Sequence, residues 1–168
     1  MSDYLVVAPI PPDGRLQVFA HVNSGGTVQL HTRTKATSDP NSLWTFPWAP
    51  FVPPPPPAPF PNAPIFEDMT AGVLSDGRTQ IWGLHFDGQV YTTRKVSTAP
   101  DSPWEPWRVF DITPITDPRN RPIGVSAAAL PDKRLQLFFI GPYPDLQIWT
   151  TWQTTRDPNS RWTKLQIL

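Results

Sequence analysis

The fold is decided by the stretch Asp76-Gly77-Arg78-Thr79-Gln80-Ile81-Trp82, because this pattern occurs three times in the chain. The first copy reads Asp13-Gly14-Arg15-Leu16-Gln17-Val18-Phe19, and the third reads Asp132-Lys133-Arg134-Leu135-Gln136-Leu137-Phe138. Each copy is followed by a second stretch rich in Thr and then by a polar loop that ends in a tryptophan, at Trp44, Trp104 and Trp162. Self-similarity at a long spacing indicates a repeat architecture. The chain is therefore predicted to hold three copies of one structural unit.

Each unit is predicted to be four antiparallel β-strands. Apolar and polar residues alternate within the units, which is the periodicity of a strand, and turn-forming residues such as Asp87-Gly88 separate the runs. Strands are expected at residues 5–8, 15–21, 27–35 and 44–51, then at 69–74, 78–86, 89–96 and 104–110, and finally at 124–130, 134–140, 145–153 and 162–168. The pattern favours an all-β fold.

Three four-stranded units of this length are typical of the blades of a β-propeller. We predict a single propeller-type domain over residues 1–168, with repeats at about 4–51, 68–110 and 123–168. Closed propellers have roughly four to eight blades, so three blades leave two apolar faces bare. The simplest closure is a homodimer that forms a six-bladed ring. A trimer would give a nine-bladed ring, and a lone three-bladed chain would abandon closure.

Two connectors separate the repeats, at residues 52–64 and 111–122. Proline makes up 24 of the 168 residues, and five of these prolines are consecutive at residues 53–57. Such a run favours a polyproline II conformation, which suits a semi-rigid spacer or a ligand for a proline-recognising module. The spacer is favoured, because the segment joins two units that must stay close together.

Charge and composition exclude several classes of function. The chain has 14 basic and 14 acidic residues, so it lacks the basic face that nucleic acid requires. No apolar run is long enough for membrane insertion, and the first residues do not have the layout of a secretory signal. We expect a bacterial protein that is cytoplasmic or released without a classical signal peptide. The chain has no cysteine, which excludes disulfides and thiolate chemistry.

No pattern for catalysis or for a metal is present. His21, His31 and His85 lack a metal-ligand spacing, and the acidic residues recur at turns rather than as a catalytic pair. There is also no nucleophile elbow and no phosphate-binding glycine loop. We therefore expect no enzymatic activity, no metal and no cofactor.

Aromatic rings that recur beside guanidinium, amide and hydroxyl groups suit a sugar. The rings pack on the apolar C–H face of a pyranose, and the polar groups fix its hydroxyls. The competing interpretation is that the aromatic residues form the core between units, and it is preferred for Phe19, Trp82 and Phe138. The candidate ligand-binding residues are Arg33, Gln80, Tyr91, Arg94, Gln136, Trp149 and Trp152.

The units resemble the blades of bacterial PLL-type β-propeller lectins and, more distantly, of tectonin-like and fungal fucose-binding propellers. The resemblance rests on residues 13–19, on Trp149-Thr150-Thr151-Trp152-Gln153 and on the Pro-Asn-x-x-Trp ending at residues 158–162. It implies binding of fucosylated or methylated sugars in clefts between adjacent blades, through Trp, Arg and acidic or amide side chains. Those lectins often have an acidic residue where Gln17, Gln80 and Gln136 stand here.

The leading hypothesis is a non-enzymatic, multivalent carbohydrate-binding lectin whose partners are glycans. Repetition of weak sites around a ring would raise their combined affinity. The second hypothesis is a structural or protein-interaction propeller that binds no sugar, because a fold does not determine a function.

Overall fold

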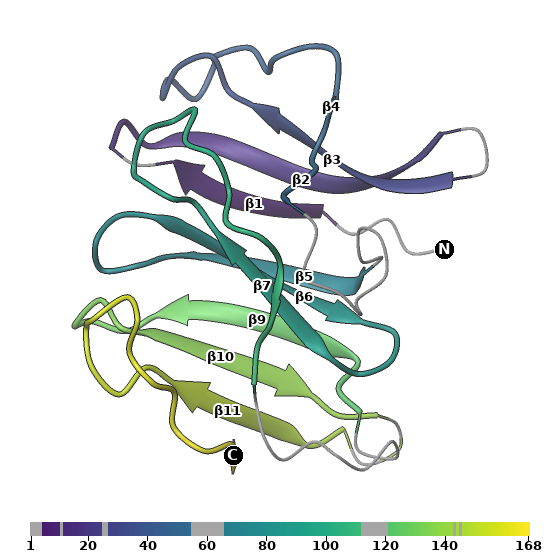
Figure 1. Ribbon diagram of the computed structural model, residues 1–168, viewed down its shortest axis with the longest axis vertical. Coiled ribbons are helices and arrows are strands. Elements are labelled where there is room, and N and C mark those ends of the chain that lie inside the picture. Colours follow the sequence, from purple (N-terminus) through teal and green to yellow (C-terminus); the bar gives the residue numbers. More distant parts are fainter. Residues whose placement is uncertain are drawn as a thin grey trace.

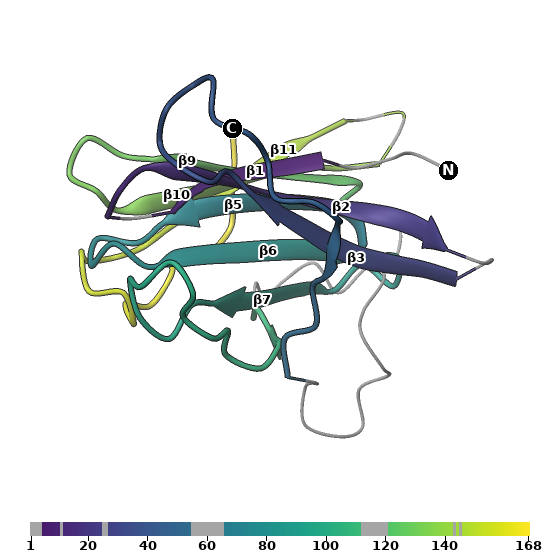
Figure 2. The same cartoon turned by 90° about the horizontal axis from the view of Figure 1, so that it is seen from above.

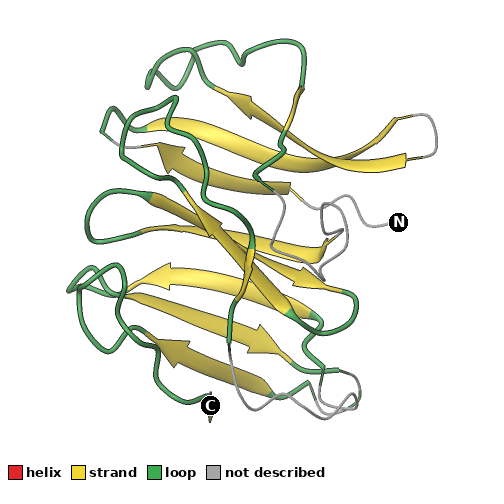
Figure 3. Ribbon diagram, viewed as in Figure 1, coloured by secondary structure: helices red, strands yellow, loops and turns green. Residues whose placement is uncertain are grey.

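The computed structural model describes residues 5–10, 12–24, 27–54, 66–111, 121–142, 144 and 146–168. The regular elements in these ranges are all β-strands (Figure 3). In the described ranges, no helix is long and apolar enough to cross a membrane. The two connectors lie mostly outside these ranges, so the polyproline conformation of residues 53–57 stays a prediction.

The strands form three four-stranded antiparallel sheets, as expected for an all-β chain. The first sheet contains β1 (Leu5–Ile10), β2 (Arg15–Ser24), β3 (Thr27–Thr34) and β4 (Ala49–Pro50). The second contains β5 (Phe66–Val73), β6 (Thr79–His85), β7 (Val90–Arg94) and β8 (Arg108–Val109). The third contains β9 (Gly124–Ala129), β10 (Leu135–Ile140), β11 (Ile148–Trp152) and β12 (Gln166–Ile167). Strands that follow one another in sequence are neighbours in each sheet.

The fourth strand of each sheet is much shorter than the sequence predicts. The chain first makes an isolated bridge from the tryptophan to the end of the third strand, and it pairs again only for two residues. The bridges join Lys35 to Trp44, Lys95 to Trp104 and Gln153 to Trp162. Prolines interrupt this stretch in the first two sheets, but the third sheet has none there. The broken outer edge is therefore a property of the repeat rather than of proline alone.

The turn between the first and second strands has the same geometry in all three sheets. Its central residue adopts the left-handed conformation, with φ of 73° at Gly14, 88° at Gly77 and 69° at Lys133. Glycine suits this conformation because it has no Cβ, so Lys133 is the unusual residue of the three. Within each turn the aspartate accepts hydrogen bonds from the backbone and the guanidinium of the arginine two residues later.

The sheets stack face to face in the order first, second, third, as Figure 1 shows from top to bottom. The backbones of adjacent sheets come closest to each other at the first strand of each sheet, where β5 packs beside both β1 and β9. Figure 2 shows these three strands close together at one side of the molecule. Side chains of β5 also bond to the backbone of β9: Asp68 accepts from Val125 N at 2.8 Å, and Thr70 accepts from Ala127 N at 2.9 Å.

We call the apolar layer between two adjacent sheets a seam, and both seams have the same aromatic centre. In the first seam Trp104 of the second sheet meets Phe19 and Phe51 of the first sheet edge to face, with ring centroids 5.8 and 5.1 Å apart. In the second seam Trp162 of the third sheet meets Trp82 and Phe110 of the second sheet in the same way, at 6.0 and 5.1 Å. Edge-to-face contacts add to the large apolar area that aromatic rings bury. Trp104 thus joins the second sheet to the first, and Trp162 joins the third sheet to the second.

The second seam generates a prediction for Trp82, whose side chain is 0% exposed. Trp82→Ala should lower the free energy of unfolding by about 3–5 kcal/mol, because it opens a cavity beneath Trp162 and Phe110. Urea denaturation followed by circular dichroism measures the loss. Val96→Ala is the control, because Val96 is 52% exposed and its truncation should cost less than about 1 kcal/mol. A similarly small loss for Trp82→Ala would contradict the seam.

Candidate functional site

Each sheet holds a glutamine of its second strand against a threonine of its third strand. The amide nitrogens of Gln17, Gln80 and Gln136 donate to the hydroxyls of Thr32, Thr92 and Thr150 at 2.9, 2.8 and 2.7 Å. Each threonine hydroxyl donates in turn to a backbone carbonyl of the second strand, at Val18, Ile81 and Leu137. These bonds fix the rotamers of both side chains, so each sheet presents a rigid polar spot on one face.

A cleft of about 310 Å³ opens beside the second seam, and we call it the internal cleft. The second sheet lines it with Gln80 of β6, Thr92 of β7, Arg108 and Val109 of β8, and the following Phe110 and Asp111. The third sheet lines it with Pro158, Asn159, Ser160 and Trp162, which belong to the loop after β11. The rigid Gln–Thr pair therefore forms one wall, and a loop of the next sheet forms the other.

The loop wall is held in shape by its own hydrogen bonds. Asp157 accepts from the backbone N–H of Asn159 at 2.8 Å, and Ser160 accepts from the backbone N–H of Thr155 at 2.9 Å. Aspartate and serine commonly fix turns in this way. The Asn159 side chain is exposed at the cleft, where its amide can both donate and accept.

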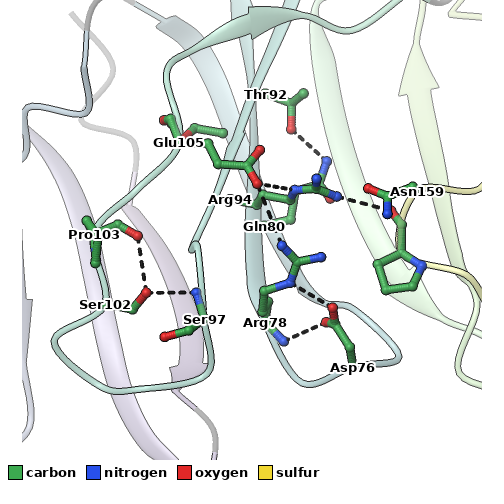
Figure 4. A network of polar contacts seen from close by, with 12 residues as sticks. Asp76, Arg78, Gln80, Thr92, Arg94, Ser97, Ser102, Pro103, Glu105 and Asn159 are labelled. Carbon is green, nitrogen blue, oxygen red and sulfur yellow. Dashed lines mark hydrogen bonds and ion pairs between the residues drawn. The ribbon is translucent and has the colours of Figure 1, made fainter.

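Arg94 ties the second sheet to this loop. Its Nε donates to Glu105 Oε1 at 2.8 Å, and its Nη1 donates to the carbonyl oxygen of Pro158 at 3.3 Å. Glu105 also lies 3.6 Å from Arg78 Nη1, and Arg78 pairs with Asp76 at 2.7 Å. Figure 4 shows Arg94 in the middle of this network, between Glu105 and the loop that carries Asn159. Through its bond to Pro158, Arg94 positions the loop beside the internal cleft, and the side chain itself is only 8% exposed.

Arg108 brings a guanidinium group into the internal cleft. Desolvation lowers the pKa of Arg108 below its ordinary value, the positive charge of Arg94 lowers it further, and Glu105 raises it. An arginine nevertheless stays protonated at neutral pH. The cleft thus combines a cationic donor, a carboxylate, two amides and two hydroxyls with the rings of Phe110 and Trp162. These groups can hydrogen-bond the hydroxyls of a polar ring and pack on its apolar face.

The structure brings together two of the predicted ligand-binding residues, Gln80 and Arg94. Gln80 lines the internal cleft, and Arg94 lies directly beside it. Their backbones pair across β6 and β7. That either residue contacts a ligand stays a prediction.

Tyr91 and Trp149 lie in the core rather than in the internal cleft. Tyr91 is 3% exposed in the cluster between the first and second sheets, and its hydroxyl donates to Gln89 at 3.1 Å. Trp149 is 9% exposed in the cluster between the second and third sheets. In these positions both rings pack against a neighbouring sheet, and their predicted contact with a ligand stays untested.

The remaining predicted residues lie on the two outer faces of the stack. Leu137 and Phe139 of β10 point into the second seam, so Gln136 and the paired Trp152 occupy the opposite face. Arg33 lies at the other end, on the first sheet. Its guanidinium carbon is 4.5 Å from the ring centroid of Trp48 and 5.1 Å from that of Phe46. These three residues therefore do not line the internal cleft.

The sequence did not single out four residues of the internal cleft as ligand-binding: Arg108, Asp111, Asn159 and Trp162. Arg108 belongs to a two-residue outer strand, and Asn159 belongs to a loop, so neither has a strand periodicity to mark it. The signal that could have pointed to Asn159 and Trp162 is the Pro-Asn-x-x-Trp ending that contains them. It recurs at Pro40-Asn41-Ser42-Leu43-Trp44 and at Pro158-Asn159-Ser160-Arg161-Trp162.

His21 is half-buried, and one of its ring nitrogens is buried without a hydrogen-bond partner within the described residues. Its ring lies parallel to that of Phe66, with centroids 6.5 Å apart, and its Nε2 has no hydrogen bond within the described residues. Burial lowers the pKa of His21 below the ordinary 6.5, because the charged imidazolium would lose its hydration. In the same described ranges, no group of three or more His, Cys, Asp or Glu side chains could hold a metal ion.

Comparison with known proteins gives likenesses in structure but not in sequence. No family model and no curated protein matches the chain. A protein of unknown function from Dyadobacter fermentans has a TM-score of 0.60 at 11% identity, over 97% of this chain. This chain spans half the length of that protein. A fucose lectin from Kordia zhangzhouensis, solved with methyl-fucoside, has a TM-score of 0.48 at 11% identity, over 98% of this chain and 96% of that one.

The first likeness shows a shared all-β fold and nothing about activity, and the second is too loose to carry an argument. The resemblance of the blades to PLL-type and tectonin-like lectins stays a prediction.

The burial of His21 predicts acid sensitivity. Because the pKa is lower in the folded chain, the unfolded chain takes up the proton first, at about pH 6.5. The free energy of unfolding should therefore fall as the pH drops from 7.5 to 5.5. His21→Gln should show a shallower fall over this range, measured by urea denaturation at both pH values. An equal fall in the wild type and the variant would contradict the assignment to His21.

Proposed function

We propose that the protein is a non-enzymatic carbohydrate-binding lectin that holds a sugar in the internal cleft. The observation that carries the proposal is the composition of this cleft, whose lining combines the rings of Trp162 and Phe110 with hydrogen-bonding groups, among them the Gln80 amide that its bond to Thr92 holds in place. A pyranose offers the matching surface, with one face of C–H groups and a rim of hydroxyls. Glycans are accordingly the proposed partners.

The order of the groups suggests how the sugar would be bound. Gln80 is locked by its bond to Thr92, so its amide would meet a hydroxyl without losing rotamer freedom. Arg108 and Asn159 would donate from opposite walls of the internal cleft. Arg94 would act indirectly, because it fixes the loop that carries Asn159.

The proposal includes closure of the three sheets into a propeller by a second copy. Inside the chain, each seam needs a tryptophan from one sheet and two large apolar residues from the preceding one. The first sheet has such a tryptophan, Trp44, which is 37% exposed and meets no preceding sheet among the described residues. The third sheet has Phe138 and Leu168 at the positions of Trp82 and Phe110, with Leu168 71% exposed. The two ends of the stack are therefore complementary halves of a seam.

Two copies joined at both pairs of ends would form a six-bladed ring. The contact is head to tail, and a ring of two such copies closes without leaving either end exposed. Each ring would contain two internal clefts, so a glycan with several terminal sugars would bind through more than one of them.

The sugar-binding proposal is tested on a glycan array followed by titration calorimetry. The wild type should bind at least one glycan, and Arg108→Ala and Asn159→Ala should each weaken binding about tenfold or more, which is the effect of losing one good hydrogen bond. Arg161→Ala is the matched control, because Arg161 is an exposed arginine of the same loop that does not line the internal cleft. Wild type that binds no glycan, or an Arg108→Ala variant with unchanged affinity and an unchanged number of sites, would contradict the proposal.

Ring closure is tested by the mass in solution. Light scattering should give twice the 18.9 kDa of one chain at micromolar concentration. A stable particle with the mass of a single chain would contradict closure by a homodimer.

A further inference from the structure

The loops that follow the third strands suggest a second kind of cleft. Residues 39–44 read Asp-Pro-Asn-Ser-Leu-Trp, and residues 157–162 read Asp-Pro-Asn-Ser-Arg-Trp, so they differ at one position only. The second loop forms a wall of the internal cleft. The first loop has the same build but lies at the free end of the first sheet, where neither of the other two described sheets covers it.

The two loops also share their hydrogen bonds. Asp39 accepts from the N–H of Asn41 at 2.7 Å, as Asp157 does from Asn159 at 2.8 Å. Ser42 accepts from the N–H of Thr37 at 2.8 Å, and Ser160 accepts from the N–H of Thr155 at 2.9 Å. The loop of the second sheet lacks both the aspartate and the asparagine, because Ala99 and Asp101 stand in their places. The first loop is therefore a preformed copy of a cleft wall.

The other wall is present at the free face of the third sheet. Strand pairing places Gln136 and Thr150 at the positions of Gln80 and Thr92, with the same hydrogen bond between them. Pairing also places Gln166 at the position of Arg108, and Trp152 at the position of Arg94. Gln166 is exposed and Trp152 is half-buried. The free face of the third sheet thus has the wall of a cleft that strands supply, but it lacks the wall that a loop supplies.

We propose that a second copy of this chain completes a binding site at the junction of the two subunits. The strand wall is Gln136, Thr150, Trp152 and Gln166 of one copy, and the loop wall is Asn41 and Trp44 of the other. This inference rests on the proposed function and deepens it, because the site is incomplete in a single chain. Each closed ring of two copies contains two such junction clefts.

The junction cleft differs from the internal cleft in its polar groups. Gln166 stands at the position of Arg108, which lines the internal cleft, and Trp152 stands at the position of Arg94, which lies beside it. Uncharged amides hydrogen-bond hydroxyls without favouring an anion, and an indole packs on the C–H face of a pyranose. The junction cleft therefore takes a neutral sugar, preferably one with a methyl or another apolar edge.

The test uses the fact that the two walls come from different copies. All proteins carry Arg108→Ala, which disables the internal cleft. One variant adds Trp152→Ala to the strand wall, with Gln166→Ala as a second strand-wall variant in case Trp152→Ala disturbs folding. The other adds Asn41→Ala to the loop wall. Titration calorimetry with methyl-fucoside, methyl-galactoside and methyl-mannoside measures binding after light scattering has verified the dimer.

The Arg108→Ala parent should bind at least one of the three glycosides. Each wall variant alone should no longer bind that glycoside. When the two wall variants are unfolded and refolded together, random pairing makes heterodimers with one intact junction, which should restore about a quarter of the parent's sites. Any of three results would overturn the junction cleft. The parent could bind none of the glycosides although the wild type does. The wall variants could bind as the parent does, or the refolded mixture could recover no binding sites. A wild type that binds no glycan would instead overturn the proposed function.

Discussion

The structure depends on one contact, a tryptophan placed edge to face against two aromatic rings of the preceding sheet. Trp104 makes this contact with Phe19 and Phe51, and Trp162 makes it with Trp82 and Phe110. The tryptophan comes at the end of a polar loop, so the contact fixes the loop and the seam together. A four-stranded sheet of this size has two apolar faces and cannot cover them alone, which explains why the sheets stack in a fixed order.

The binding cleft follows from the same contact. Because Trp162 is anchored in the second seam, the loop before it lies over the edge of the second sheet, opposite Gln80 and Thr92. The Gln–Thr bond is present in all three sheets, including the outer face of the third, where no neighbour requires it. The Gln–Thr bond is therefore a feature of the repeat that joins the second and third strands of every sheet. It becomes a rigid wall of a cleft wherever a loop of another sheet lies across it.

Much of the fold could be predicted from the sequence, because the repeated Asp-x-Arg turn and the alternation after it determine the strands locally. The outer strands were predicted too long, since their interruption depends on how the tryptophan enters the seam. For the site, Gln80 and Arg94 were predicted to bind a ligand, and they lie in and beside the internal cleft. The alternation of residues along a strand shows which side chains share a face. In a stack of sheets, however, a neighbouring sheet can cover either face. The alternation therefore could not show that Tyr91 and Trp149 lie in the core. Arg108 and Asn159 come from a short edge strand and a loop, which carry no periodic signal.

Trp44 tests the central claim, because its ring occupies the position of Trp104 and Trp162 but meets no preceding sheet in the part of the chain that the structure describes. Sedimentation equilibrium of Trp44→Ala beside the wild type is the most direct measurement. The account predicts that the variant remains folded by circular dichroism, since no internal seam uses this ring, and that its self-association weakens at least about tenfold. A variant that self-associates as strongly as the wild type would show that the aromatic contact does not join the copies.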